Sequence, residues 1–208
     1  FEAEWERGLR EDPLRATYLG DRRYEDRWPD LSPAALARRH AADQAVLEAL
    51  AAIPSDSLSA NDRLNQKLFR RLHQGKLDEH GWGLQYLPIT QRDGVQSAHE
   101  LAELLPFATI GDYENWIARL NGLGPYLDQT IDLMREGMRR GLVQPRIVME
   151  RVPAQIARQV VEDPAASPFF GPFATMPEAI PAAEQQRLRN DALRAIELYA
   201  AHEHADNH

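Results

Sequence analysis

The 208-residue sequence contains no cysteine. This absence excludes disulfide bonds, thiol nucleophiles and metal sites built from cysteine. No apolar run approaches the roughly 18 residues that a membrane-spanning helix needs, so no membrane span is expected. The Gly-x-Ser-x-Gly motif of serine hydrolases and the glycine-rich loops that bind phosphate are also missing. The sequence therefore offers no complete catalytic motif.

The charge balance argues against a nucleic-acid partner. The formal net charge is -8, whereas proteins that bind a phosphate backbone usually present a basic surface. Adjacent arginines do occur, but they are interleaved with carboxylates, which is typical of solvated helix faces. An apolar share of 43% and a charged share of 27% are ordinary for a folded globular protein. We expect a single helical domain over residues 1–208, with residues 81–93 as the candidate internal boundary.

Capping residues and apolar spacing predict helices in the first half of the chain. Ser32 followed by Pro33 predicts a helix start, and this helix should end near Pro54. Ser59 begins the next helix, which should end before Gly81. An apolar stripe at four-residue spacing runs along it, formed by Leu64, Leu68 and Leu72. Residues 81–92 are expected to include a short extended piece, and residues 94–105 return to helical spacing.

The second half shows the strongest helical periodicity. Asp112 is the expected cap of one helix, Pro125 begins another, and Gly141 is well placed to end it. Pro145 opens a third helix, in which Pro153 predicts a kink or a break. The apolar face of this helix is expected to consist of Val148, Val152, Ile156 and Val160. The short linkers favour antiparallel neighbours.

A proline-rich segment separates these helices from the last one. Its five prolines, at 164, 168, 172, 177 and 181, disfavour a helix, yet Phe169, Phe170 and Phe173 are too apolar for a free linker. We expect an ordered strap whose rings dock on the helices, with a ligand-facing rim as the alternative. Pro181 then leads into a final helix, whose apolar stripe is expected to consist of Leu188, Ala192, Ile196 and Tyr199. The predicted fold is all-α: an irregular antiparallel helical bundle with an ordered Pro/Phe-rich strap.

Several segments, taken in order, resemble a known bacterial family. They are Pro13-Leu14-Arg15-Ala16-Thr17-Tyr18-Leu19-Gly20, Tyr24, Asp30-Leu31-Ser32, the run from Leu58 to Asn65, Asp112-Tyr113, Arg119-Leu120, the run from Arg135-Glu136-Gly137 to Pro145, Ser167-Pro168-Phe169 and Pro172-Phe173. Each segment alone is weak, but together they cover most of the chain. The ordered set is similar to the amino-terminal part of the domain of unknown function 885 family. Fuller members of that family look like zinc metallopeptidases.

The resemblance implies a role without catalytic residues. The family's histidine-glutamate zinc motif lies downstream of the matched region, and this chain ends at His208, before that part is expected. No cofactor is therefore expected in this chain, and zinc only in the downstream part. The implied role is a non-catalytic helical region that contributes to a substrate cleft or docks the carboxy-terminal half. Its implied partners are that half, a peptide substrate, or a second copy through self-association at an apolar face. The resemblance also suggests the bacterial envelope or periplasm.

Three arginines in or near the best-matched region are candidates for binding a peptide carboxylate, because a guanidinium forms a two-pronged contact with that group. They are Arg119, Arg135 and Arg146. The alternative is that they pair with neighbouring acids such as Glu114, Asp132 and Glu150.

The carboxy-terminal end is a candidate metal site. His202 and Asp206 share a helical face and His204 lies between them, but a third ligand on that face is not evident, so adventitious metal binding is expected. His99 and Glu103 also have four-residue spacing, with an exposed helix pair as the alternative. Two further hypotheses stay open: a stand-alone helical protein-interaction module without enzymatic activity, and a small metallohydrolase that uses the histidine-rich tail.

Overall fold

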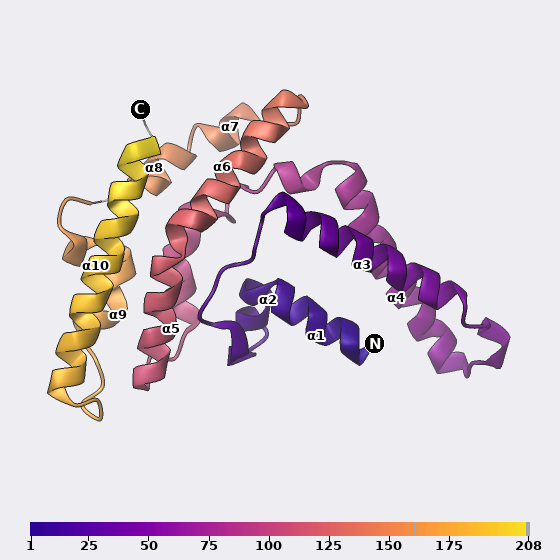
Figure 1. Ribbon diagram of the computed structural model, residues 1–208, viewed down its shortest axis with the longest axis horizontal. Helices are drawn as coiled ribbons and strands as arrows, with labels where there is room; N and C mark the ends of the chain where they lie inside the picture. Colours follow the sequence, from indigo (N-terminus) through magenta and orange to yellow (C-terminus); the bar gives the residue numbers. More distant parts are fainter. Residues whose placement is uncertain (160, 207–208) are drawn as a thin grey trace. The chain divides into compact units, whose positions relative to one another are not determined.

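The computed structural model describes residues 1–159 and 161–206, with side chains up to His202, and every regular element in this range is helical (Figure 1). The prediction of an all-α fold is confirmed. The α-helices are α1 Glu2–Glu11, α2 Pro13–Tyr18, α3 Pro33–Ala51, α4 Ala60–Gly81, α5 Ile110–Asn121, α6 Leu123–Arg139, α7 Arg146–Met149, α8 Val152–Ile156, α9 Gly171–Ala174 and α10 Ala182–Asp206. The 3-10 helices are η1 Arg22–Tyr24, η2 Ser55–Ser57, η3 Leu84–Tyr86, η4 Val95–Leu104, η5 Pro164–Ala166 and η6 Pro168–Phe170. None of the helices in the described range is long and apolar enough to cross a bilayer.

The chain forms two compact units. Unit 1 comprises Phe1–Asp30, Ile89–Ile131 and Gln144–His208, and unit 2 comprises Leu31–Pro88 and Asp132–Val143. Helix α6 contributes its first residues to unit 1 and its last ones to unit 2. One of the junctions, between Pro88 and Ile89, falls in the stretch 81–93 that the sequence marks as a candidate boundary.

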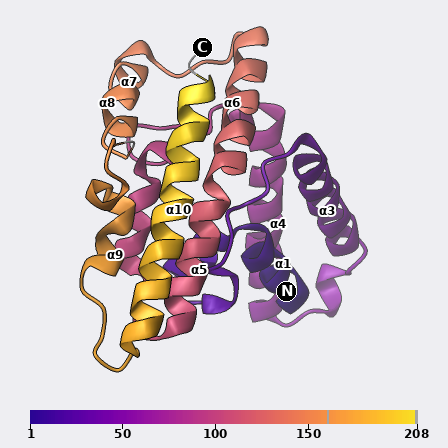
Figure 2. The ribbon, with the colours of Figure 1, turned by 60° about the vertical axis from the view of Figure 1, so that its left-hand side comes forward.

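The core of unit 1 lies along α5 and α10, which run side by side (Figure 2). Trp116 and Tyr113 on α5 are fully buried, with 0% and 1% of their surface exposed. The apolar stripe of α10 is buried against them and consists of Leu188, Ala192, Ile196 and Tyr199. Each large side chain buried in this way contributes about 1.5–3 kcal/mol relative to an exposed one. The α10 stripe expected from Pro181 onward is thus confirmed.

The proline-rich segment is an ordered strap, as predicted. Phe169 and Phe173 are both 0% exposed, and the indole nitrogen of Trp116 donates a hydrogen bond to the Phe169 carbonyl over 3.1 Å. The expectation that its prolines exclude helix was wrong, because η6 and α9 form there with a proline in the first turn of each. A proline is tolerated in that position because the N–H that it lacks would have no intrahelical partner.

The ends of α5 and α6 differ slightly from the prediction. Thr109 caps α5, and Asp112 is the third helical residue, which returns the contact in a capping box. The assignment of Asp112 as the cap was therefore wrong by three residues. Helix α6 begins at Leu123, two residues before Pro125. Gly141 lies just beyond its end with φ +73°, a left-handed conformation that favours glycine and stops the helix.

The break expected at Pro153 is present. The segment after Pro145 forms two short helices, α7 and α8, and Pro153 lies at the start of the second. Val160, which the sequence placed on the same face, lies outside the described residues.

Unit 2 is built on the hairpin of α3 and α4 (Figure 1). Its predicted caps are confirmed: the Ser32 hydroxyl accepts from the Ala35 N–H, and the Ser59 hydroxyl accepts from the Asp62 N–H. The extended piece expected near residues 82–89 was wrong. Gly83 adopts φ +78° and leads into the 3-10 helix η3, and the described residues contain no strand with which an extended piece could pair.

The apolar stripe of α4 exists but does not pack into the hairpin. Leu64, Leu68 and Leu72 are 54%, 58% and 49% exposed. The residues of α4 that are buried instead are Gln66 and His73. The helix turns by about 100° per residue, which places this polar pair roughly opposite the leucines. The interior of the hairpin is therefore polar, and its leucines face outward.

Candidate functional site

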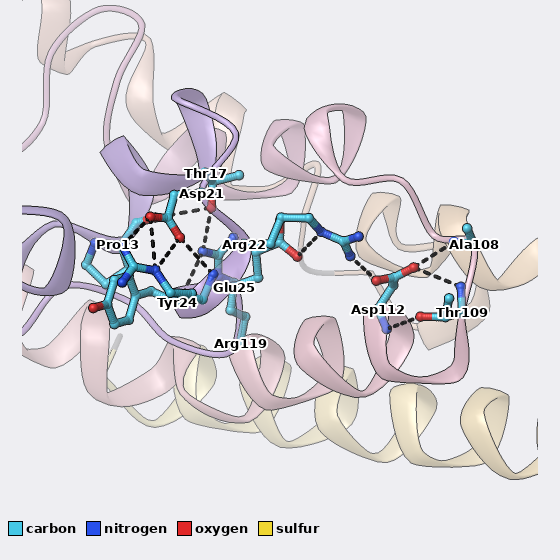
Figure 3. Close-up of polar contacts among 11 residues, drawn as sticks. Pro13, Thr17, Asp21, Arg22, Tyr24, Glu25, Ala108, Thr109, Asp112 and Arg119 are labelled. Carbon is cyan, nitrogen blue, oxygen red and sulfur yellow. Dashed lines mark hydrogen bonds and ion pairs between the residues drawn. The ribbon is translucent and has the colours of Figure 1, made fainter. Parts of the chain in front are cut away.

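The most deeply buried charge in unit 1 is the guanidinium of Arg119, which is 0% exposed. Its Nε donates to the Arg27 carbonyl over 3.1 Å. Its Nη2 donates to the Thr17 hydroxyl over 2.9 Å and to the Tyr24 carbonyl over 3.2 Å. The indole of Trp28 completes the enclosure: the guanidinium lies 5.7 Å from its ring centroid, and its Nε1 donates to the Arg119 carbonyl over 2.7 Å. Arg119 thus ties α5 to α2 and to the segment that follows α2 (Figure 3).

The electrostatics of Arg119 follow from this burial. Removal from water lowers its pKa from 12.5 to about 10, although the carboxylates of Glu25 and Asp26 act in the opposite direction. The side chain therefore remains charged at neutral pH. Its Nη1 has no hydrogen-bond partner among the described residues. This buried donor is the one part of the fork that the scaffold leaves unused.

A second polar contact joins the same segment to the start of α5. The guanidinium of Arg22 donates to Asp112 Oδ1, and Asp112 Oδ2 accepts from the N–H groups of Ala108 and Thr109 over 2.9 and 2.8 Å (Figure 3). Burial alone would raise the pKa of Asp112. The N–H groups of Thr109 and Ala108 and the charge of Arg22 outweigh this and lower it. Asp112 is therefore an ionised structural carboxylate.

Unit 1 also contains a pocket of about 440 Å³. One wall is formed by the rings of Trp28 and Tyr126, stacked with centroids 5.1 Å apart. Arg15 and Arg92 also line it, and Glu100 supplies a carboxylate. Burial, with the charge of Asp12 as a smaller contribution, raises the pKa of Tyr126 to about 12. Its hydroxyl therefore stays protonated at physiological pH. The pocket combines an aromatic wall with charges of both signs.

The three arginine candidates do not form one site. Arg119 is buried, whereas the side chain of Arg146 is 92% exposed and its Nε lies 2.6 Å from Glu150. Arg135 belongs to unit 2 and lies 3.5 Å from Asp132. The pairings with Asp132 and Glu150 that the sequence offered as the alternative are both present. Glu114 pairs with Arg187 over 2.7 Å.

The carboxy-terminal candidates are only partly described. The Nε2 of His202 lies 2.8 Å from Asp128 Oδ1, and the His202 ring lies beside Gly124, where an added Cβ would approach it to 3.3 Å. The side chains of His204 and Asp206 lie outside the described residues. His99 lies in the 3-10 helix η4, where residues four apart are not on one face, so it does not share a face with Glu103.

Unit 2 has a polar centre that the sequence did not reveal. The His73 ring is 2% exposed and its Nδ1 lies 2.8 Å from Asp43 Oδ1. On the same two helices, the rings of His40 and His80 stack with centroids 4.1 Å apart. Burial lowers the pKa of His80, and His40 adds to this effect. The only hint in the sequence was the polar face of α4 opposite its leucines. Within unit 1 and within unit 2, no three described His, Asp or Glu side chains approach one another as metal ligands do.

These contacts define an all-helical protein whose buried polar groups mainly join its own segments. The chain belongs to the family of bacterial proteins of unknown function designated DUF885, whose model matches residues 13–206. A comparison with curated proteins gave no match.

Proposed function

We propose that this chain is a non-catalytic helical module of a metallopeptidase-like protein. In that role it forms part of the wall of a substrate cleft, or holds the region that carries the zinc motif. The metallopeptidase assignment rests on the resemblance of the sequence segments quoted above. The non-catalytic assignment rests on what those segments do in the fold.

The observation that carries the proposal is the inward use of polar groups in the segments of resemblance. The Thr17 hydroxyl accepts from Arg119 and donates to the Pro13 carbonyl over 3.1 Å. The Ser167 hydroxyl donates to the Gln159 carbonyl over 3.0 Å. Both hydroxyls belong to buried residues and donate their proton within the fold, so they are not free to bind or transform a substrate. These segments are therefore best explained as the parts that assemble the scaffold.

The described residues do not fit a zinc centre within either unit. A catalytic zinc site needs three protein ligands around one point, and no such set of described side chains lies within unit 1 or within unit 2. In the proposed protein the zinc ligands belong to another region.

The pocket in unit 1 is the part of this chain best suited to touch a peptide. The stacked rings of Trp28 and Tyr126 offer a flat apolar wall. Arg15 and Arg92 lie on its lining and make no ion pair with a described residue. A peptide segment presents apolar side chains beside polar and charged groups, and such a lining suits it.

The test compares two proteins: the 208-residue chain, and the protein encoded by the whole reading frame from which it comes. Zinc content is measured by mass spectrometry and turnover by hydrolysis of a quenched-fluorescence peptide library. We expect both properties in a longer protein that carries a His-Glu-x-x-His motif and neither in the chain alone. Peptide hydrolysis by the chain alone, with one bound zinc per molecule, would overturn the proposal.

A second measurement tests the pocket in the active longer protein. Replacing Arg15 and Arg92 by alanine should raise KM for peptides and leave kcat unchanged, because both side chains would contribute uniform binding. Arg10, an exposed arginine of unit 1 that does not line the pocket, is the matched control. If the Arg10 substitution changed KM as much as the pocket substitutions do, the pocket would not be part of the substrate cleft.

A further inference from the structure

Helix α4 carries two parallel rows of side chains on its outer surface. One row is apolar and consists of Leu64, Leu68 and Leu72; the other is cationic and consists of Arg63, Lys67 and Arg71. Both rows repeat every four residues, and each cation directly precedes a leucine. Because residues four apart share a face of an α-helix, the rows run side by side along the axis. From Leu64 to Leu72 they extend for about 12 Å.

Within the described part of the chain, the leucines are not fully buried and the three cations form no ion pair. The leucines are half exposed. The three cations are also exposed, and none forms an ion pair with a described residue. Lys76 on the same helix differs, because its Nζ lies 3.7 Å from Asp43. The polar interior of the hairpin explains this arrangement: Gln66 and His73 occupy the side of α4 that faces α3, which leaves the leucines no internal partner.

We propose that this face of α4 docks an amphipathic helix whose apolar seam is edged by carboxylates. The apolar row is one leucine wide, which matches the seam of a helix–helix pair. The adjoining cationic row selects a partner with acidic residues beside its own apolar seam, as charged positions flanking a helical seam do. The charges give orientation and choice of partner, while the leucines give the buried area. This surface is independent of the proposed function and can be occupied whether or not the chain belongs to a peptidase.

A second copy of the chain does not fit this face. In an antiparallel two-fold pair of α4 helices, each cationic row would lie against the cationic row of its copy. In a parallel pair it would lie against the other flank of the leucine row, where Asn65 and Phe69 supply no carboxylate. Like charges across a seam are destabilising. An anionic membrane surface fits less well, because interfacial helices bury a broad apolar face that commonly contains aromatic residues.

The probe is a synthetic helical peptide with leucines along one face and a glutamate row beside them, titrated into the labelled chain and followed by fluorescence anisotropy. Binding should weaken about ten-fold or more for Leu68→Ala and for Lys67→Glu, the range expected for central contacts. Arg10→Glu is the matched control. Arg10 is an exposed cation of α1 with no ion pair to a described residue, and it belongs to neither row of α4. It should leave affinity within about two-fold.

Charge exchange gives the sharpest outcome. The chain with Arg63, Lys67 and Arg71 all changed to glutamate should lose the acidic peptide and gain a version whose glutamates are replaced by lysine. All substituted side chains are exposed, and circular dichroism checks that the variants retain their helical content. Absence of binding to the acidic peptide, or binding that ignores both rows, overturns the proposal. So does sedimentation showing a dimer that Leu68→Ala dissolves, or row-dependent binding to anionic lipid vesicles without binding to the peptide.

Discussion

Replacing Arg119 by methionine tests the central contact of unit 1. Methionine keeps much of the length and the apolar stem of the side chain but removes the guanidinium. Three donated hydrogen bonds disappear with it, to the carbonyls of Arg27 and Tyr24 and to the hydroxyl of Thr17. The two carbonyls lose a buried donor, and a buried polar group without a partner is costly.

The size of the effect follows from two opposing contributions. A hydrogen bond from a charged donor contributes about 1.5–3 kcal/mol, so three of them give about 5–9 kcal/mol. Against this, the fall in the pKa of Arg119 from 12.5 to about 10 corresponds to about 3 kcal/mol of cost for keeping the buried group charged. The expected net loss is therefore roughly 2–6 kcal/mol, a large part of the 5–15 kcal/mol of a typical domain.

The assay is urea unfolding followed by far-ultraviolet circular dichroism. The free energy of unfolding of Arg119→Lys should lie between those of the wild type and Arg119→Met, because lysine keeps the charge but lacks the planar guanidinium. Arg146→Met is the control, since that side chain is 92% exposed, and its free energy of unfolding should change by less than about 0.5 kcal/mol. If Arg119→Met were as stable as this control, the guanidinium would not hold the scaffold together.

Three further perturbations probe other parts of the chain. The pKa of Asp112 is lowered in the folded state, so its contribution to stability is complete above the unfolded pKa of about 4 and is lost as the pH falls through the folded pKa. Asp112→Asn should therefore make the free energy of unfolding depend less on pH in the acid range. An unchanged midpoint of acid unfolding would contradict this. The pKa of His80 is also lowered, but for a base the unfolded state then binds more protons below about pH 6.5. Unit 2 should lose stability from pH 7 to 5, which amide hydrogen exchange would detect. His80→Gln should remove that pH dependence. If the stability of the variant fell equally with pH, His80 would be excluded as the source. A Cβ on Gly137 would lie 2.7 Å from a backbone carbonyl, so Gly137→Ala should lower the melting temperature through a loss of about 1–3 kcal/mol. Gly75, also helical, has nothing within 4 Å of such a Cβ, and Gly75→Ala should raise stability by about 0.5–1 kcal/mol; the opposite order of the two variants would refute the packing argument.

Local signals predicted the helices well where a cap or a proline set a boundary. Ser32, Ser59 and Gly141 act where expected because their side-chain or backbone preferences work over a single turn. The same signals failed at Asp112, where Thr109 three residues earlier offered the better cap. The T-x-x-D spacing of a capping box was present in the sequence and would have located the helix start.

The candidate site was harder to predict, because its partners come from distant parts of the chain. Arg119 was selected as a group that binds a carboxylate from outside, but its donors meet carbonyls about ninety residues earlier. Nothing in the local sequence distinguishes an arginine that will be buried from one that stays exposed, such as Arg146. The contact between Arg22 and Asp112 could not be predicted from the sequence for the same reason.

The sequence by itself determined the helical class, the break near Pro153 and the burial of the strap. Helix propensity and capping depend only on residues close in sequence, and the gain from burying aromatic rings depends on their area and not on a particular partner. The sequence also set the spacing of the leucines on α4. Only the tertiary structure decided which face of α4 is buried, because that depends on the partners that the opposite, polar face finds. Gln66 and His73 find hydrogen bonds with α3 and the loop that follows it, and a buried polar group with a partner can occupy an interior that hydrophobicity alone would assign to leucine.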